Sequence, residues 1–463
     1  MSILYDTLKL LRLISKYRIL DTIVKANSSL LSYGLYNLCI IIFHPPNIFL
    51  SKRSLDSHQV IQVCKSLGPI YVKFAQAIST RPDVFGEKAC AFLQTLQDKL
   101  NPFAFEIVAE TIRKELGRSL EEIFADFDPV SFAAASVAQV HKARLHSGQS
   151  VAVKVLRPKI KERYAKDLKT LRFIAKILLF LMPNWQKFKI QEILSVFNDT
   201  MLLELNLKIE AAHCSELAGN CAKDTNIYIP YVYWALTTEN ILVSQWIDGI
   251  SIYDAEKINS AGLDAAALSR QVAVMFFNQT YRDGFFHADL HPGNIFLTHD
   301  GKIALVDFGI MGRLSQQDRL TVAQILHALL NRNYMRVAQI HAAAGYIPKT
   351  TDLSLFALHC RAICEPIVGL ALKDVSINNI LSQLFAVIQK FGLEIQPQLI
   401  MLQKSMIIIE GIGKILDPNI NMWYIAAPWM EKWATKNLTI EAKLCKLLKR
   451  FKESSFYSQF DII

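Results

Sequence analysis

The chain has 463 residues, of which 52% are hydrophobic and 20% charged, with only 18 glycines and 15 prolines. This composition excludes a disulfide-stabilised miniprotein, an intrinsically disordered chain and a low-complexity or collagen-like protein. The formal net charge of +10 is compatible with nucleic acid, an anionic lipid surface or a phosphorylated ligand as partner, so the distribution of the charge has to distinguish them.

Residues 1–125 are predicted to form a helical extension. Residues 1–25 hold five basic and two acidic side chains, and their apolar residues recur at helical spacing: Leu4, Leu8, Leu11 and Ile14. We expect no secretory signal, because charged residues interrupt this first apolar run. The apolar stretch 35–43 is too short to cross a bilayer, which takes about 20 apolar residues.

A first lobe is predicted over residues 126–247. Two extended runs, 136–145 and 150–155, flank a polar turn and indicate a β-hairpin. Helical patterns follow over residues 160–219, and a short extended run occupies residues 241–247.

A second, larger lobe is predicted over residues 248–430. A helical pattern over residues 265–283 precedes a second hairpin, in which 295–297 and 303–306 are joined by an Asp-Gly turn. After about Gln316 the patterns are helical. The expected fold class is α+β, predominantly helical, with helical extensions at both ends.

Residues 431–463 are predicted to form a basic amphipathic segment, with seven basic side chains and one acidic between residues 432 and 452. One face of such a helix would be apolar, formed by Ile440, Leu444, Leu447, Leu448 and Phe451. The remainder would be mostly basic, with Lys443, Lys446, Lys449, Arg450 and Lys452. The two chain ends carry nine of the ten net positive charges. This distribution favours an anionic membrane surface and argues against nucleic acid, although two surface helices packed on the body are the alternative.

Three motifs match the catalytic set of protein kinases in the right order. Lys154 ends a strand-like Val-Ala-Val-Lys run, residues 287–294 read His-Ala-Asp-Leu-His-Pro-Gly-Asn, and Asp307-Phe-Gly follows a hydrophobic strand. The match predicts that Lys154 binds the α and β phosphates of ATP and that Asp289 orients or deprotonates the acceptor. Asn294 and Asp307 would hold Mg²⁺, a hard cation that prefers oxygen ligands.

A lysine among apolar strand residues needs a carboxylate partner, because an unpaired buried charge is costly. The helical stretch that begins at Glu204 supplies two candidates, Glu204 and Glu210, and we favour Glu210 as the partner of Lys154.

Two further segments are predicted to contact the nucleotide. The strand before Lys154 lacks a glycine-rich loop, so Cβ atoms occupy a loop that usually approaches the phosphates as bare backbone. The residues concerned are Ala133, Ala134, Ala135, Ser136 and Gln139. Backbone groups of Gln245, Trp246 and Ile247 are expected to bind the adenine edge.

Two features of an ordinary protein kinase are missing. The 287–294 loop has no arginine to read a phosphorylated activation segment, so activation by loop phosphorylation is not expected. No Ala-Pro-Glu follows Asp307 at a plausible distance, which makes a protein substrate doubtful.

The chain resembles, over nearly its whole length, the UbiB family of atypical kinases, which is tied to ubiquinone biosynthesis. The residues that carry the resemblance are Lys73-Phe-Ala-Gln76 with Ser79–Asp83 after it, the 133–136 loop leading to Gln139-Val-His141, and the 287–294 loop. Glu204-Leu-Asn206 and the stretch 396–413 look like the bacterial members.

The resemblance implies an atypical protein-kinase-like two-lobed fold that binds ATP and Mg²⁺. It also implies that an element of the N-terminal extension covers the nucleotide site, with Lys73 and Gln76 near Glu204 and Asn206. Ala75 stands where the family has glycine, which puts the inhibitory role of that element in doubt.

Many bacterial members end in a hydrophobic hairpin, and none precedes Ile463, so we expect peripheral attachment to the cytoplasmic face of a bacterial inner membrane. The expected function is that of an ATP-dependent kinase or ATPase acting on a small molecule or lipid-like quinone precursor, or coupling ATP hydrolysis to precursor access. Other ubiquinone biosynthesis enzymes are candidate partners. The alternative is a nucleotide-binding pseudokinase scaffold for those enzymes.

Overall fold

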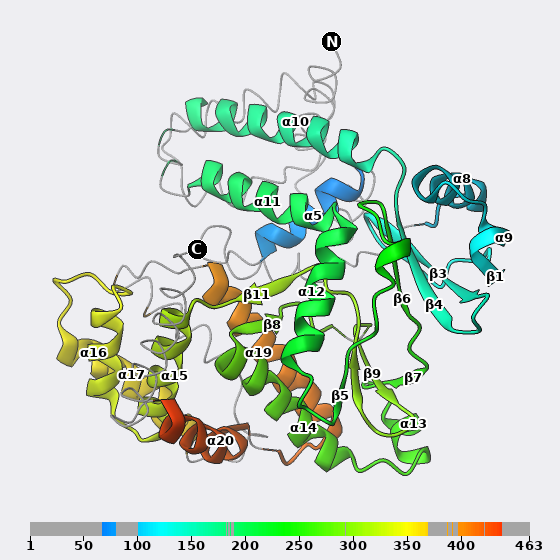
Figure 1. Cartoon of the computed structure of the whole chain (residues 1–463). Coiled ribbons are helices and arrows are strands. Elements are labelled where there is room, and N and C mark those ends of the chain that lie inside the picture. Colours follow the sequence, from blue (N-terminus) through cyan, green and yellow to red (C-terminus); the bar gives the residue numbers. More distant parts are fainter. Residues whose placement is uncertain are drawn as a thin grey trace, which may run out of the picture. The chain divides into compact units, whose positions relative to one another are not determined.

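The computed structural model describes residues 67–79, 101–181, 183, 186, 189–291, 293–368, 387, 391, 397–420 and 422–437 (Figure 1). The amphipathic pattern of residues 1–25, the apolar stretch 35–43, the residues 80–83 and the predicted basic stripe from Ile440 onward lie outside these ranges. Two compact units divide the chain. The first takes residues up to 215 together with 231–246, and the second takes 216–230 together with everything from 247 onward.

A five-stranded antiparallel sheet organises the first unit. Its strands are β1 (Phe124–Phe127), β2 (Ala133–Ala134), β3 (Ala138–Leu145), β4 (Ser150–Leu156) and β6 (Ile241–Gln245). Their order is β1-β3-β4-β6, and β2 pairs with β3 outside this path. The first predicted hairpin is therefore confirmed as β3 and β4.

Alternation along β4 separates the two faces of this sheet. Val151, Val153 and Val155 are fully buried in a cluster with residues of α8 (Phe105–Leu116) and α9 (Leu120–Ile123). Because successive strand residues point to opposite faces, Lys154 projects from the face away from that cluster.

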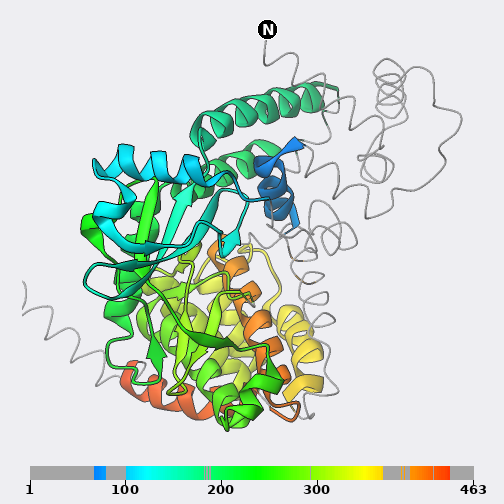
Figure 2. The same ribbon diagram turned by 90° about the vertical axis from the view of Figure 1, so that its right-hand side faces the viewer.

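Four further helices begin in the first unit: α5 (Pro69–Ser79), α10 (Ile160–Leu181), α11 (Ile190–Glu204) and α12 (Leu207–Asn220), together with the short η2 turn (Trp234–Leu236). Figure 2 shows α10 and α11 side by side, and the hydroxyl of Tyr164 donates to Asn198 Oδ1 across them at 3.0 Å. The Phe74 ring of α5 meets Phe197 of α11 edge-on at 5.2 Å. The hydrogen bond thus joins α10 to α11, and the ring contact joins α5 to α11.

The second unit contains two small sheets. One has the order β5 (Ile227–Tyr228), β10 (Ile303–Leu305), β9 (Ile295–Thr298) and β7 (Gly249–Ser251), and the other pairs β11 (Met311–Arg313) with β8 (Phe285–His287). The second predicted hairpin is confirmed as β9 and β10. Its turn needs Gly301, because the residue there has a φ of 75° and donates its N–H to Thr298 O.

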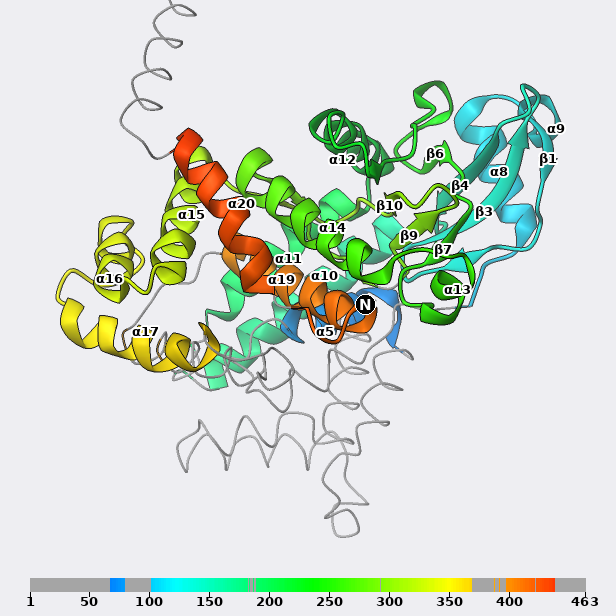
Figure 3. The same ribbon diagram turned by 90° about the horizontal axis from the view of Figure 1, so that it is seen from below.

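Helices make up the rest of the second unit. They are α13 (Ala255–Ser260), α14 (Ala265–Phe277), the π-helical turn η3 (Asn278–Asp283), α15 (Gln316–Leu330), α16 (Tyr334–Ala343), α17 (Leu353–Val368), α19 (Pro397–Leu416) and α20 (Met422–Asn437). Figure 3 shows α14, α19 and α20 running together, and α14 packs against both of the others. The predicted predominantly helical α+β class is confirmed.

The beginning of the predicted basic segment lies in α20. Trp433 is buried there, and its Nε1 donates to Tyr281 O at 3.1 Å, so residues 431–437 pack on the body of the second unit. Residues 438–463 lie outside the description. Within the described ranges, no helix is both long and apolar enough to cross a membrane.

Candidate functional site

Lys154 and Glu210 form a buried ion pair in the first unit. Lys154 Nζ donates to both carboxylate oxygens of Glu210, at 2.7 and 2.9 Å. The two side chains are 16% and 5% exposed. Two contacts to one carboxylate hold the ammonium in a single position, which suits a lysine that has to meet a phosphate group. The structure thus joins the two residues that the sequence pairs, while their roles stay predictions.

Packing of α12 explains why Glu210 reaches the sheet. Leu207, Ala211 and Cys214 are buried at helical spacing, and the N–H of Leu207 donates to Glu239 O at 2.9 Å. Burial raises the pKa of the Cys214 thiol to about 12, and the charge of Glu210 acts in the same direction. The thiol is therefore neutral and serves as packing.

A second lysine–glutamate pair lies between α5 and α11. Lys73 Nζ is 3.1 Å from Glu204 Oε2, with side-chain exposures of 15% and 7%. Ala75 is buried in the same helix and Gln76 is half-buried. Asn206, which follows α11, accepts the N–H of Lys208 at its side-chain oxygen. The proximity of Lys73 and Glu204 that the resemblance implies is present.

Arg157 holds the loop of residues 133–136 from one side. Its Nε and Nη2 donate to Ala135 O at 3.1 and 2.8 Å, and Nη2 also donates to Asn101 O at 2.9 Å. The N–H of Ala135 donates to Ala138 O, which closes a tight turn. Ser136 is fully buried, and its hydroxyl has no hydrogen-bond partner among the described residues. Hydrogen bonds at Ala135 therefore hold the backbone of this loop, whose contact with a nucleotide stays a prediction.

The structure corrects the prediction that Gln139 contacts the nucleotide. Gln139 pairs with Val155, so its side chain lies on the sheet face opposite Lys154, where it is 1% exposed. Its Oε1 accepts the N–H of Phe103 at 2.9 Å, and its Nε2 lies 2.9 Å from His141 Nε2. Gln139 anchors the chain at Phe103 instead of binding a ligand.

His141 completes that internal network as a neutral ring. The carbonyl oxygen of Asp128 can only accept, so the 2.8 Å contact places the proton of His141 on Nδ1 and leaves Nε2 to accept from Gln139. Burial lowers the pKa of His141, in agreement with a neutral imidazole.

The structure also corrects part of the prediction for adenine. The N–H of Gln245 donates to Tyr231 O at 2.8 Å, and the N–H of Trp246 donates to Ser150 O at 3.0 Å. These two donors are used within the sheet, so they do not read an adenine edge. The Trp246 ring meets Phe132 edge-on at 4.9 Å and lies 4.8 Å from Lys142 Nζ. Ile247 begins the stretch that belongs to the second unit.

In the second unit, His287 shapes the loop that carries Asp289. His287 is fully buried, and its Nδ1 accepts the N–H of Asp289 at 3.2 Å. Its Nε2 lies 3.2 Å from Val306 O and carries the proton, because a carbonyl oxygen can only accept. Burial lowers the pKa of His287, which keeps the ring neutral. The imidazole therefore ties the loop to the strand that leads to Asp307.

Asn294 is tied to the same strand. Its Nδ2 donates to Asp289 O at 2.9 Å, and the N–H of Val306 donates to Asn294 O at 3.0 Å. The first bond sets the orientation of the amide, with Oδ1 on the other side from Asp289 O. The hairpin of β9 and β10 brings Asn294 and Val306 together, so Asn294 and Asp307 lie at the same end of it.

Asp307 has an unusual backbone conformation. Its φ of 62° lies in the left-handed region, which is uncommon for a residue other than glycine. Asp307 Oδ1 accepts the N–H of Gly309 at 3.4 Å, and the neighbouring Phe308 is buried with its ring 5.7 Å from His287. Such strain is concentrated at functional sites, and the sequence did not predict it.

The donor set of Asn294 and Asp307 fits Mg²⁺ as a cation shared with a nucleotide. One amide and one carboxylate are hard oxygen donors, and Mg²⁺ commonly takes one or two protein ligands together with phosphate oxygens and water. Among the described residues, no group of three or more histidine, cysteine, aspartate or glutamate side chains is placed to hold a metal. A dedicated all-protein metal cage is therefore not the arrangement in the part of the chain described.

Sequence reasoning missed one residue beside Asp289. Lys404 of α19 donates from Nζ to Asp289 Oδ1 at 3.0 Å. No local motif indicates this contact, because the two residues are 115 positions apart. Only the packing of α19 places them together.

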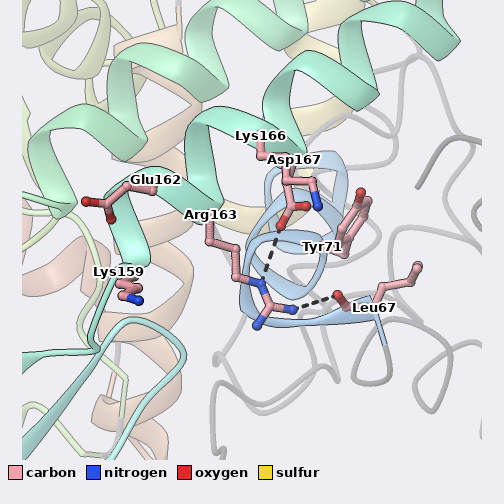
Figure 4. Close-up of a pocket in the computed structure, with 7 residues that line it drawn as sticks. All are labelled: Leu67, Tyr71, Lys159, Glu162, Arg163, Lys166 and Asp167. Atoms are coloured by element: carbon pink, nitrogen blue, oxygen red, sulfur yellow. Dashed lines mark hydrogen bonds and ion pairs between the residues drawn. The ribbon is translucent and has the colours of Figure 1, made fainter. Parts of the chain in front are cut away.

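A separate open pocket of about 410 Å³ lies where α5 meets the start of α10 (Figure 4). Arg163 crosses it, donating from Nη2 to Leu67 O at 3.1 Å and lying 3.7 Å from Asp167 Oδ2. The backbone at Gly68 has a φ of 120°, a conformation that favours glycine, and Arg163 Nη2 lies 2.1 Å from the position that a Cβ would take there. The predicted nucleotide and metal residues do not line this pocket, and its lining mixes basic and acidic side chains.

Comparisons with known proteins identify relatives. The chain matches the ABC1 atypical kinase-like domain over residues 95–341 and the UbiB helical domain over residues 360–421. It is 39% identical over 398 residues to "Probable protein kinase UbiB" of Marinobacter nauticus, covering 85% of this chain and 73% of that protein. Among solved structures, the Rv3197–erythromycin complex from Mycobacterium tuberculosis is similar with a TM-score of 0.52 and 23% identity, covering 80% of this chain and 94% of the other. This last likeness concerns the fold alone, and with the ABC1 match it confirms the kinase-like fold class.

Proposed function

The chain belongs to the UbiB family of atypical kinases, and from this premise we propose that it is an ATP-dependent kinase-like phosphotransferase or ATPase that supports ubiquinone biosynthesis. The observation that carries the proposal is the pair of contacts from Lys154 to Glu210, at 2.7 and 2.9 Å. A buried lysine held by two carboxylate contacts is the arrangement required of a kinase strand lysine.

The residues of each unit have separate tasks in this proposal. In the first unit, Lys154 binds the α and β phosphates of ATP, and Glu210 keeps its ammonium in place. In the second unit, Asn294 and Asp307 hold Mg²⁺, which when bound neutralises charge on the phosphate chain. Asp289 orients the acceptor hydroxyl and accepts its proton.

The proposed acceptor is a small molecule or lipid-like quinone precursor, or water. Support comes from the missing Ala-Pro-Glu element, which in protein kinases belongs to the region that receives a peptide. The same ATP turnover is compatible with coupling hydrolysis to precursor access, with other ubiquinone biosynthesis enzymes as partners.

The decisive test of enzymatic function is Asp307→Asn. Removing one carboxylate from the metal site should lower Mg²⁺-dependent ATP turnover by about 10²-fold or more, since electrostatic stabilisation supplies most of the rate in phosphoryl transfer. Steady-state release of inorganic phosphate by purified wild type and variant measures it. Asp300→Asn is the matched control, because Asp300 is an exposed aspartate in the β9–β10 turn.

Equal turnover by Asp307→Asn and wild type would contradict the proposal. Complementation of a ubiquinone defect by Asp289→Asn would instead favour the pseudokinase scaffold, which needs no acceptor base.

We further propose peripheral attachment to the cytoplasmic face of a bacterial inner membrane through the basic chain ends. Support comes from the net charge of +9 at those ends, which hold twelve basic and three acidic side chains. Replacing Lys443, Lys446, Lys449, Arg450 and Lys452 by glutamine should reduce flotation with anionic vesicles, because each basic residue contributes about 1 kcal/mol near such a surface. Wild-type binding should also weaken with salt, and salt-independent binding or an unchanged variant would contradict the electrostatic mechanism.

A further inference from the structure

The helix α19 is fixed on the catalytic loop of the second unit. Leu402, Ser405, Ile409 and Ile412 are buried at helical spacing, which defines the face that packs inward. The hydroxyl of Ser405 donates to His287 O at 3.4 Å, so this face contacts the loop that begins at His287.

A second hydrogen bond secures the other end of α19. The hydroxyl of Ser269 in α14 donates to Gly413 O at 3.2 Å, and both oxygen atoms lie in the core of the unit. With contacts to β8 at one point and to α14 at another, the helix has little freedom to slide or rotate.

Lys404 is placed at the rim of the inward face by this packing. It directly precedes the buried Ser405, and its Nζ reaches Asp289 Oδ1 at 3.0 Å with side-chain exposures of 45% and 28%. The 287–294 loop contains no lysine or arginine of its own. A positive charge beside Asp289 is therefore supplied by the helical segment instead of by the loop.

We propose that Lys404 is a positioning residue of the phosphotransfer centre. Its ammonium contacts the Asp289 carboxylate and fixes the direction of that side chain, so that the carboxylate is already oriented toward the acceptor hydroxyl. In the transfer, the acceptor oxygen bonds to the γ-phosphorus, the bond to the β–γ bridging oxygen breaks with its electron pair leaving on ADP, and Asp289 takes the acceptor proton. Lys404 gives up no proton. The inference rests on the proposed function and deepens it.

The contact between Lys404 and Asp289 joins the two domains that the chain matches. Asp289 lies within the ABC1 match at residues 95–341, whereas Lys404 lies within the UbiB helical match at residues 360–421. In this proposal the helical domain is a component of the catalytic centre, because it supplies the lysine that contacts Asp289.

The test compares Lys404→Met and Lys404→Arg in the full chain. Methionine keeps the length of the side chain without charge, and we expect it to lower kcat for ATP about tenfold or more, a change of about 1.4 kcal/mol in the activation barrier. The Kd for ATP, measured by calorimetry, should change by less than about twofold, because Lys404 acts through Asp289 and not on nucleotide binding. Lys404→Arg should restore most of the turnover, since arginine keeps the charge and reach.

Two controls separate positioning from a general structural effect. Lys302→Gln removes a comparably exposed lysine of the same unit, paired with Asp300 at 2.7 Å, and should leave kcat unchanged. In an Asp289→Asn background, Lys404→Met should have no further effect, because two residues that act as one unit are not additive.

The outcomes are distinct. Turnover by wild type with an unchanged or raised kcat in Lys404→Met would overturn the role of Lys404 while leaving the proposed function in place. An equal loss in the Asp289→Asn background would also overturn it, because Lys404 would then act independently of Asp289. Absence of Mg²⁺-dependent turnover by wild type would overturn the proposed function, and this inference with it.

Discussion

Two lysine–carboxylate pairs contain the proposed phosphate-handling and acceptor-handling residues, and they differ in burial. In the first unit, Lys154 contacts both oxygens of Glu210, and the two side chains are 16% and 5% exposed. In the second unit, Lys404 contacts one oxygen of Asp289, with exposures of 45% and 28%. A buried pair is costly to break because one charge is left without a partner, whereas an exposed pair adds little to stability.

This difference in burial indicates that the two ion pairs have different roles. Lys154 belongs to the packed interior of the first unit. The ion pair with Glu210 therefore affects both the stability of the unit and the position of the Lys154 ammonium. Lys404 is accessible to water, so its contribution has to come from the charge that it places beside Asp289 and not from the stability of the unit. Mutations of the two lysines should therefore affect stability and turnover in different proportions.

The largest effect is expected for Lys154→Met. Removing the ammonium that contacts both oxygens of the buried Glu210 should lower the free energy of unfolding by about 3 kcal/mol, and ATP turnover should be lost with the phosphate contact. Urea denaturation followed by circular dichroism gives the first quantity and phosphate release the second.

The double variant Lys154→Met/Glu210→Leu sharpens this result. Replacing both partners by apolar side chains should return most of the stability without restoring turnover. A single variant that unfolds at the wild-type urea concentration would contradict the view that the pair is buried and mutually dependent.

The smallest stability effect is expected for Lys404→Met. Since the pair with Asp289 is exposed and makes one contact, the free energy of unfolding should change by less than about 0.5 kcal/mol, even though turnover falls. The same denaturation measurement checks it, with Lys302→Gln as the comparison. A loss of several kcal/mol would mean that Lys404 is structural and would remove the contrast between the two pairs.

The fold was largely predictable because its signals are local. Both hairpins follow from alternating runs around polar turns, and β3–β4 and β9–β10 form as expected. The helical pattern over residues 265–283 is also present, although its last six residues, Asn278–Asp283, form a π-helical turn. A π turn depends on packing around it, which a periodic pattern does not contain.

Site residues were predictable where a motif spans few residues. The prediction failed where the direction of a side chain or of a backbone group decides the contact. Gln139 was assigned to the nucleotide because it follows the alanine loop, yet its pairing with Val155 sends it to the face opposite Lys154. A shift of the strand-pairing register by one residue moves every side chain of the strand to the other face of the sheet. The register cannot be read from the sequence of one strand. Backbone groups of Gln245, Trp246 and Ile247 were likewise assigned to adenine, but hydrogen bonds to Tyr231 O and Ser150 O use the N–H groups of Gln245 and Trp246.

What the sequence by itself determined is the set of chemical groups: a strand lysine, an aspartate in an H-x-D loop, an asparagine and a second aspartate at kinase spacing. These groups can be recognised in the sequence because each motif spans only a few consecutive residues. Tertiary structure brought two of these groups to their partners. The sequence favoured Glu210 over Glu204 for Lys154 and the packing of α12 places it there, whereas Lys404 became a neighbour of Asp289 only through the packing of α19 across 115 positions. Contacts between distant segments depend on the packing of whole helices, which no local pattern of residues encodes.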